Sequence, residues 1–118
     1  MSSDIEVYVV SGSKCVLDWL KSDQHLLDPV YDDDMVTIFP SASGLFTLTV
    51  TEQVEGGATS FYFAGEHPPW KSDTDAAYAI SAKTGTRVLF DPGDPDLPPS
   101  VFKEVSGDGT RMMNLNDD

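Results

Sequence analysis

The chain has 118 residues, and its 20 acidic and 7 basic side chains give a formal net charge of −13 at pH 7. This length is typical of one domain, here residues 1–118, and a hydrophobic content of 40% is enough for an ordinary core rather than a disordered chain. A surface this negative repels phosphate backbones and anionic lipids. We therefore expect no direct binding to nucleic acid or to a membrane surface.

The single cysteine, Cys15, excludes an intrachain disulfide and with it a disulfide-stapled secreted scaffold. The first residues show neither a basic leader nor an apolar segment of signal-peptide length. No apolar run approaches the roughly 20 residues of a membrane-spanning helix. These features predict a cytoplasmic protein.

The beginning of the chain predicts a strand followed by a helix. Ile5 to Val10 alternates apolar and polar residues as a half-buried strand does, and Ser13 is a candidate N-cap for the helix. Apolar residues then recur at helical spacing and predict one buried stripe. The members of this stripe are Cys15, Val16, Trp19, Leu20 and Leu26.

Patterns of period two follow the acidic residues 32–34, which we expect in a solvated loop. Met35 to Phe39, Leu45 to Val50 and Thr59 to Ala64 are predicted strands. Gly56-Gly57 can adopt the positive φ of a tight turn, so the last two strands are predicted to form a hairpin.

A second hairpin is predicted from Ala76 to Ala82 and Thr86 to Phe90, around a turn at residues 83–85. The segment from Asp91 to Pro99 is rich in proline and aspartate. Proline has no N–H to donate and cannot lie in a helix interior or a central strand, so we expect a surface loop here.

The C-terminal part predicts a short helix that begins at Pro98 and Pro99 and runs to Val105, followed by an edge strand from Thr110 to Leu115. The tail, residues 116–118, is expected to be frayed. Together these elements predict an α+β domain: an antiparallel sheet of about five to seven strands, with an N-terminal helix packed on one face.

Four side chains raise the possibility of catalysis. Cys15 lies near a helix start, where a thiolate can be activated beside a histidine such as His25 or His67. Membership of the apolar stripe instead favours a buried, unreactive thiol. Glu66 and His67 could do acid–base chemistry, but adjacent residues of an extended chain point to opposite faces. We expect no catalytic residue, and a small hydrolase using Cys15 or the Glu66–His67 pair stays an alternative.

No cofactor or metal is expected. The acidic segment 32–34 and the group Asp91, Asp94 and Asp96 lack the spacing of a calcium-binding EF-hand loop. Two histidines and one cysteine do not make a recognisable zinc ligand set, and the chain has no phosphate-binding glycine loop.

Trp70, at the end of the segment from Gly65 to Trp70, allows two interpretations. The ring either anchors a structural loop between the two hairpins, or it is exposed on a proline-stiffened loop as an interface hot spot.

The acidity is concentrated. Residues 22–70 contain eight Asp and Glu and no Lys or Arg. Such a surface, with aromatic side chains available, suits capture of a basic protein, because charge steers the encounter and aromatic rings anchor the complex. Solubility alone is the competing explanation.

In the order of its elements, with a strand from Ile5 to Val10, a helix from Ser13 to Ser22 and hairpins from Met35 to Ala64, the first half of the chain resembles small acidic immunity proteins of bacterial polymorphic toxin systems. This resemblance implies binding to a cognate toxin, often a nuclease or nucleic-acid deaminase, and occlusion of its active site. It carries over no site residue.

We therefore expect a non-enzymatic inhibitor of a basic partner protein. A phage-type DNA mimic that binds a host DNA-binding protein and a small subunit of a larger assembly are alternatives. The candidate contacts are Asp32, Asp33, Asp34, Glu66, Trp70, Asp73 and Asp75.

Overall fold

Every pair of neighbouring strands in the computed structural model is antiparallel, and the strands make one eight-stranded sheet. The structure describes residues 4–54, 57–93, 96–98 and 101–114. The order across the sheet is β2 (Tyr31–Asp32), β3 (Val36–Pro40), β4 (Phe46–Thr51), β5 (Thr59–Gly65), β1 (Ile5–Val9), β6 (Val88–Phe90), β7 (Val101–Ser106) and β8 (Gly109–Asn114).

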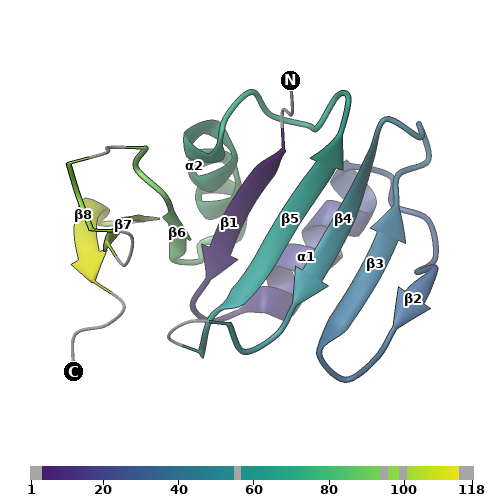
Figure 1. Cartoon of the computed structure of the whole chain (residues 1–118), viewed down its shortest axis with the longest axis horizontal. Coiled ribbons are helices and arrows are strands. Elements are labelled where there is room, and N and C mark those ends of the chain that lie inside the picture. Colours follow the sequence, from purple (N-terminus) through teal and green to yellow (C-terminus); the bar gives the residue numbers. More distant parts are fainter. Residues whose placement is uncertain (1–3, 55–56, 94–95, 99–100, 115–118) are drawn as a thin grey trace.

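Both helices, α1 (Ser13–Asp23) and α2 (Asp73–Thr84), cover the same face of the sheet, and neither lies on the other face (Figure 1). The α+β class and the antiparallel sheet are confirmed. The sheet has eight strands, however, rather than the predicted five to seven. Residues 31–32 and 101–106 form strands where a solvated loop and a helix were expected, and residues 76–82 form a helix where a strand was expected.

The central strands follow their sequence alternation. In β1, Ile5, Val7 and Val9 are buried toward the helices, while Glu6 and Tyr8 face the uncovered side. The same alternation buries one face of β4 and of β5, and the predicted hairpin between these two strands is confirmed. An apolar face on a period of two can be satisfied only by a strand with one face against a core.

Helix α1 confirms the predicted helix, but Cys15 is exposed and the prediction that it packs in the core was wrong. The helix buries Val16 and Leu20, with Trp19 partly buried beside them. Cys15 lies about 100° around the helix from Val16, on the side away from Leu20. The helix N-cap is Gly12 at φ 78°, not Ser13, which is the first helical residue.

Helix α2 occupies the segment that was predicted to be the first strand of a second hairpin, from Ala76 to Ala82. The Ser72 side chain caps the helix by accepting a hydrogen bond from the Asp75 N–H at 3.1 Å. Gly85, expected in a hairpin turn, ends the helix at φ 72°. Alanine is small and weakly apolar, so the buried stripe of an alanine-rich helix gives little periodic contrast in the sequence.

Strands β6, β7 and β8 extend the sheet beyond β1. Strand β6 pairs with β1 and β7, not with residues 76–82. The predicted short helix from Pro98 to Val105 was wrong, because residues 101–106 form β7. Side chains on both faces of this strand are buried: Phe102 packs edge-on against Tyr8 on the face that carries no helix, and Val105 belongs to the core on the other face.

The predicted edge strand from Thr110 to Leu115 is confirmed as β8, Gly109–Asn114. Leu115, the expected tail at residues 116–118, Gly56 of the Gly56-Gly57 turn, and residues 94, 95 and 99 of the expected loop from Asp91 to Pro99 lie outside the described residues.

Candidate functional site

The side chains suggested for catalysis do not form a site. Among the described residues, no hydrogen bond links Cys15 to a histidine. Glu66 and His67 are both exposed and line a shallow pocket of about 240 Å³ with Lys71. Within the described part of the chain, no three or more His, Cys, Asp or Glu side chains come together in a way that could hold a metal ion.

Trp70 is half-buried, and its ring lies against the core. It meets Phe63 edge-on, with ring centroids 5.4 Å apart, and stacks on Trp19 at 6.4 Å. The ring therefore fixes the loop between β5 and α2 onto the helix-covered face. Loss of this ring would disturb the loop as well as any contact that a partner makes with it.

The acidic candidates fall into separate groups. Asp32, Asp33 and Asp34 lie on or just after β2, the outermost strand at one edge of the sheet. Asp73 and Asp75 lie in the first turn of α2, where Asp73 contacts β1. Four strand spacings, about 19 Å in total, separate β2 from β1 across the sheet, so the two groups lie in different parts of the molecule. Glu66 lies in the loop that leads from β5 to α2.

Asp33 has a structural role at the β2–β3 turn. Its Oδ1 accepts the N–H groups of Met35 and Val36 at 2.8 and 2.7 Å, and its Oδ2 accepts the hydroxyl of Tyr31. These bonds, that from Tyr31 first, lower the pKa of the Asp33 carboxyl. The Asp33 carboxylate therefore orders the β2–β3 turn and also adds to the negative charge of this segment.

Asp73 joins α2 to β1 and lies in a negative environment. Its Oδ1 accepts the N–H of Glu6 at 3.1 Å. Burial raises the pKa of the Asp73 carboxyl, and the nearby charges of Asp91 and Glu6 raise it further, against the effect of that hydrogen bond. The sequence did not suggest this cluster, because Glu6 and Asp91 are 85 residues apart and come together only through the pairing of β1 with β6.

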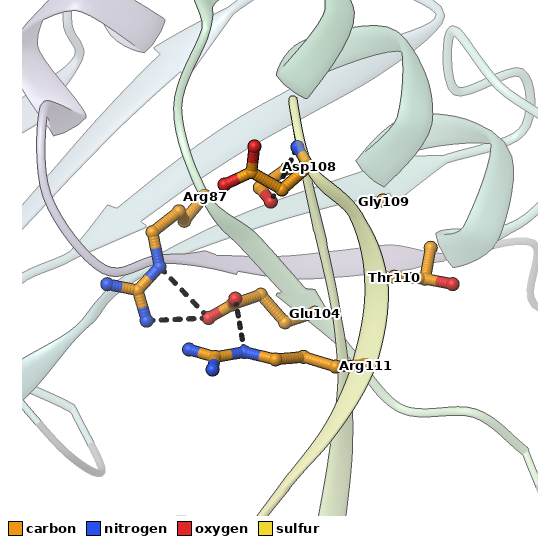
Figure 2. A pocket seen from close by; sticks show the side chains of 7 residues that line it. Arg87, Glu104, Asp108, Gly109, Thr110 and Arg111 are labelled. Atoms are coloured by element: carbon orange, nitrogen blue, oxygen red, sulfur yellow. Dashed lines mark hydrogen bonds and ion pairs between the residues drawn. The ribbon is translucent and has the colours of Figure 1, made fainter.

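A polar pocket of about 450 Å³ lies over β7 and β8, near one end of β6. Figure 2 shows Arg87 and Arg111 converging on Glu104, the most deeply buried carboxylate of the described residues. Arg87 donates to Oε2 of Glu104 at 2.7 and 3.1 Å, and Arg111 donates to Oε1 at 2.9 Å.

This arrangement compensates a buried charge. Glu104 is 3% exposed, while the side chains of Arg87 and Arg111 are 44% and 62% exposed. Burial raises the pKa of Glu104, but the two arginines outweigh it and leave the pKa lowered. Little in the sequence indicated this group of ion pairs, apart from the fact that Arg87 and Arg111 are the only two arginines of the chain.

Comparisons with known proteins give no match: no protein-family model, curated protein or solved structure is similar to this chain. No helix formed by the described residues is long and apolar enough to cross a membrane. Function must therefore be inferred from the charges and surfaces themselves.

Proposed function

We propose that this protein is a non-enzymatic binding protein that holds a basic partner protein on its acidic surface. One observation carries the proposal: within the described part of the chain, the acidic candidates form no ion pair. None of the acidic candidates lies within ion-pair distance of a described lysine or arginine, whereas both arginines pair with Glu104. These candidates are Asp32, Asp33, Asp34, Glu66, Asp73 and Asp75.

The cluster around β1 adds support. The pKa of Asp73 is raised first by burial, and the nearby charges of Asp91 and Glu6 add repulsion to that effect. A lysine or arginine from a partner would relieve that repulsion on binding. Concentrated charge of one sign also accelerates association with an oppositely charged protein.

The specific form of the proposal is neutralisation of a toxin domain of the nuclease or nucleic-acid deaminase type. Such domains bind nucleic acid through cationic surfaces. Carboxylates that occupy a cationic surface would exclude the nucleic acid substrate and inhibit the partner without any chemical step.

The test is inhibition and binding with the protein encoded by the neighbouring gene, measured by stopped-flow association at several salt concentrations. We expect the association rate to fall steeply with salt, and Asp32→Asn combined with Asp34→Asn to lower it further. Asp18→Asn combined with Asp108→Asn is the matched control, because it removes the same two negative charges at exposed positions outside the candidate group, and it should lower the rate less. A rate that is independent of salt would contradict the proposal. Equal competition with DNA for several unrelated basic proteins would favour the DNA mimic.

A further inference from the structure

The pocket over β7 and β8 offers hydrogen-bond donors that the ion pairs of Glu104 do not use. Arg87 donates to Glu104 through Nε and Nη2, and Arg111 donates through Nε alone. Nη1 of Arg87 and both terminal nitrogens of Arg111 make no hydrogen bond to any residue that the structure describes. Because both carboxylate oxygens of Glu104 already accept an arginine N–H, the remaining donors are available to an acceptor from outside the chain.

The two guanidinium groups are held in place by this buried carboxylate. One oxygen of Glu104 fixes Arg87 and the other fixes Arg111, while both arginine side chains stay partly exposed. Figure 2 shows the two arginines reaching the same carboxylate from different segments of the chain. Donors that are already oriented lose less conformational entropy when a ligand binds, so this pair is preorganised for a further acceptor.

The pocket opens on the face of the sheet that carries no helix. Tyr8, Leu89, Glu104 and Arg111 are paired in one row across β1, β6, β7 and β8, so their side chains share a face. Tyr8 lies on the helix-free side, which places the arginines there as well. The volume of about 450 Å³ is within the range of about 300–1,000 Å³ typical of sites for small molecules.

The local charge favours an acceptor with a single negative charge. Arg87 and Arg111 carry two positive charges against the one negative charge of Glu104, and none of the cation-free residues 22–70 lines the pocket. A planar carboxylate matches the parallel N–H groups of a guanidinium. Asp108 also lines the pocket and forms no ion pair with a described residue, so a doubly charged anion such as phosphate meets stronger repulsion there than a carboxylate does.

We propose that Arg87, Glu104 and Arg111 form a binding site for a carboxylate ligand. The unused N–H groups of the two arginines hold the ligand, and Glu104 positions those arginines. The carboxylate belongs either to a free small organic acid or to a Glu or Asp side chain of another protein, since both present the same group. This site goes beyond the proposed function, because a basic partner held on the acidic candidates does not require it.

The test is an NMR titration of the whole chain with sodium acetate at pH 7 and constant ionic strength. The chain has only two arginines, so two Nε–H signals report on the site. We expect both signals to shift saturably, and acetate to bind more tightly than inorganic phosphate. Arg111→Gln should weaken acetate binding, followed at the Arg87 signal, by about tenfold or more, because it removes a charged donor. Asp108→Asn should strengthen acetate binding, because it removes a repelling charge.

The matched control is Lys103→Gln, which removes one positive charge from β7 next to Glu104. Alternation along the strand places Lys103 on the opposite face, so acetate affinity should change by less than about twofold. Equal weakening in Lys103→Gln and Arg111→Gln would overturn the site, because net charge alone would then attract the anion. Arginine signals that do not saturate in wild type, or phosphate bound more tightly than acetate, would also overturn it.

A capped glutamate, with its amine acetylated and its α-carboxyl amidated, distinguishes the two sources of the carboxylate. Tighter binding than acetate assigns the site to a side chain of another protein, and weaker binding assigns it to a free organic acid. Either result supports a carboxylate site. Failure of acetate to bind leaves the salt dependence of partner association unaffected, so the two proposals fail separately.

Discussion

The interaction of Glu104 with Arg87 and Arg111 predicts a strongly non-additive effect on stability. Replacing either arginine by alanine leaves the buried carboxylate with one partner, so each single change should lower the free energy of unfolding by about 1 kcal/mol. Removing both leaves an uncompensated buried charge, a defect that typically costs about 3–5 kcal/mol. Because the arginines are 44% and 62% exposed, water can reach part of the site, and the lower end, about 3 kcal/mol, applies.

The measurement is urea unfolding at pH 7, followed by circular dichroism, on the two single variants and the double variant. A third substitution, Glu104→Gln in the double-arginine background, removes the unpaired charge and should recover part of the loss. Losses that add to within about 0.5 kcal/mol, with no recovery from Glu104→Gln, would refute the reasoning.

The contribution of Glu104 to the free energy of unfolding depends on pH with a definite sign. The pKa of Glu104 in the folded protein is lowered from 4.5, so its stabilising contribution is present above the unfolded value and is lost as pH falls through the folded value. The difference in unfolding free energy between wild type and Glu104→Gln should therefore shrink on acidification below about pH 4.5. A difference that stays constant from pH 7 to pH 3 would show that Glu104 does not titrate in this way.

Three further outcomes are expected. Asp73→Asn keeps an acceptor for the Glu6 N–H and removes a charge beside Glu6 and Asp91, so it should raise the free energy of unfolding at pH 7. A lower free energy in urea unfolding would contradict the repulsion. Trp70→Ala should lower that free energy by about 2 kcal/mol, less than for a fully buried ring, and an unchanged midpoint would show that the ring does not hold its loop. Cys15 should react with a thiol reagent about as fast in native as in urea-unfolded protein, and strong native protection would contradict its exposure.

The parts of the fold that were predictable are those in which one local pattern has one structural solution. The alternation in β1, β4 and β5 requires a strand with one buried face, and the stripe containing Val16 and Leu20 requires a helix on that face. The charge distribution was equally readable, since the absence of lysine and arginine from residues 22–70 is a property of the sequence itself.

The errors arose where burial depends on distant residues. Residues 98–105 were predicted to form a helix, and only the pairing of Glu104 with Arg87 and Arg111 explains how a carboxylate can be buried in β7. The alanines of α2 gave no clear stripe, and residues 76–82 were therefore predicted to form a strand, whereas in the structure they lie within a helix that begins after Ser72 and ends before Gly85.

Composition and local pattern thus determined an acidic α+β domain and the identity of its central strands, because hydrophobic periodicity is read within a few residues. The tertiary structure alone decided which carboxylates come together. It separated Asp32, Asp33 and Asp34 from Asp73 by four strand spacings, and it turned Trp70 toward the core. The tertiary structure also decided which apolar side chains face solvent, because exposure depends on what packs against a residue: Leu27 and Val30 are 51% and 72% exposed, whereas Val16 and Leu20 are buried.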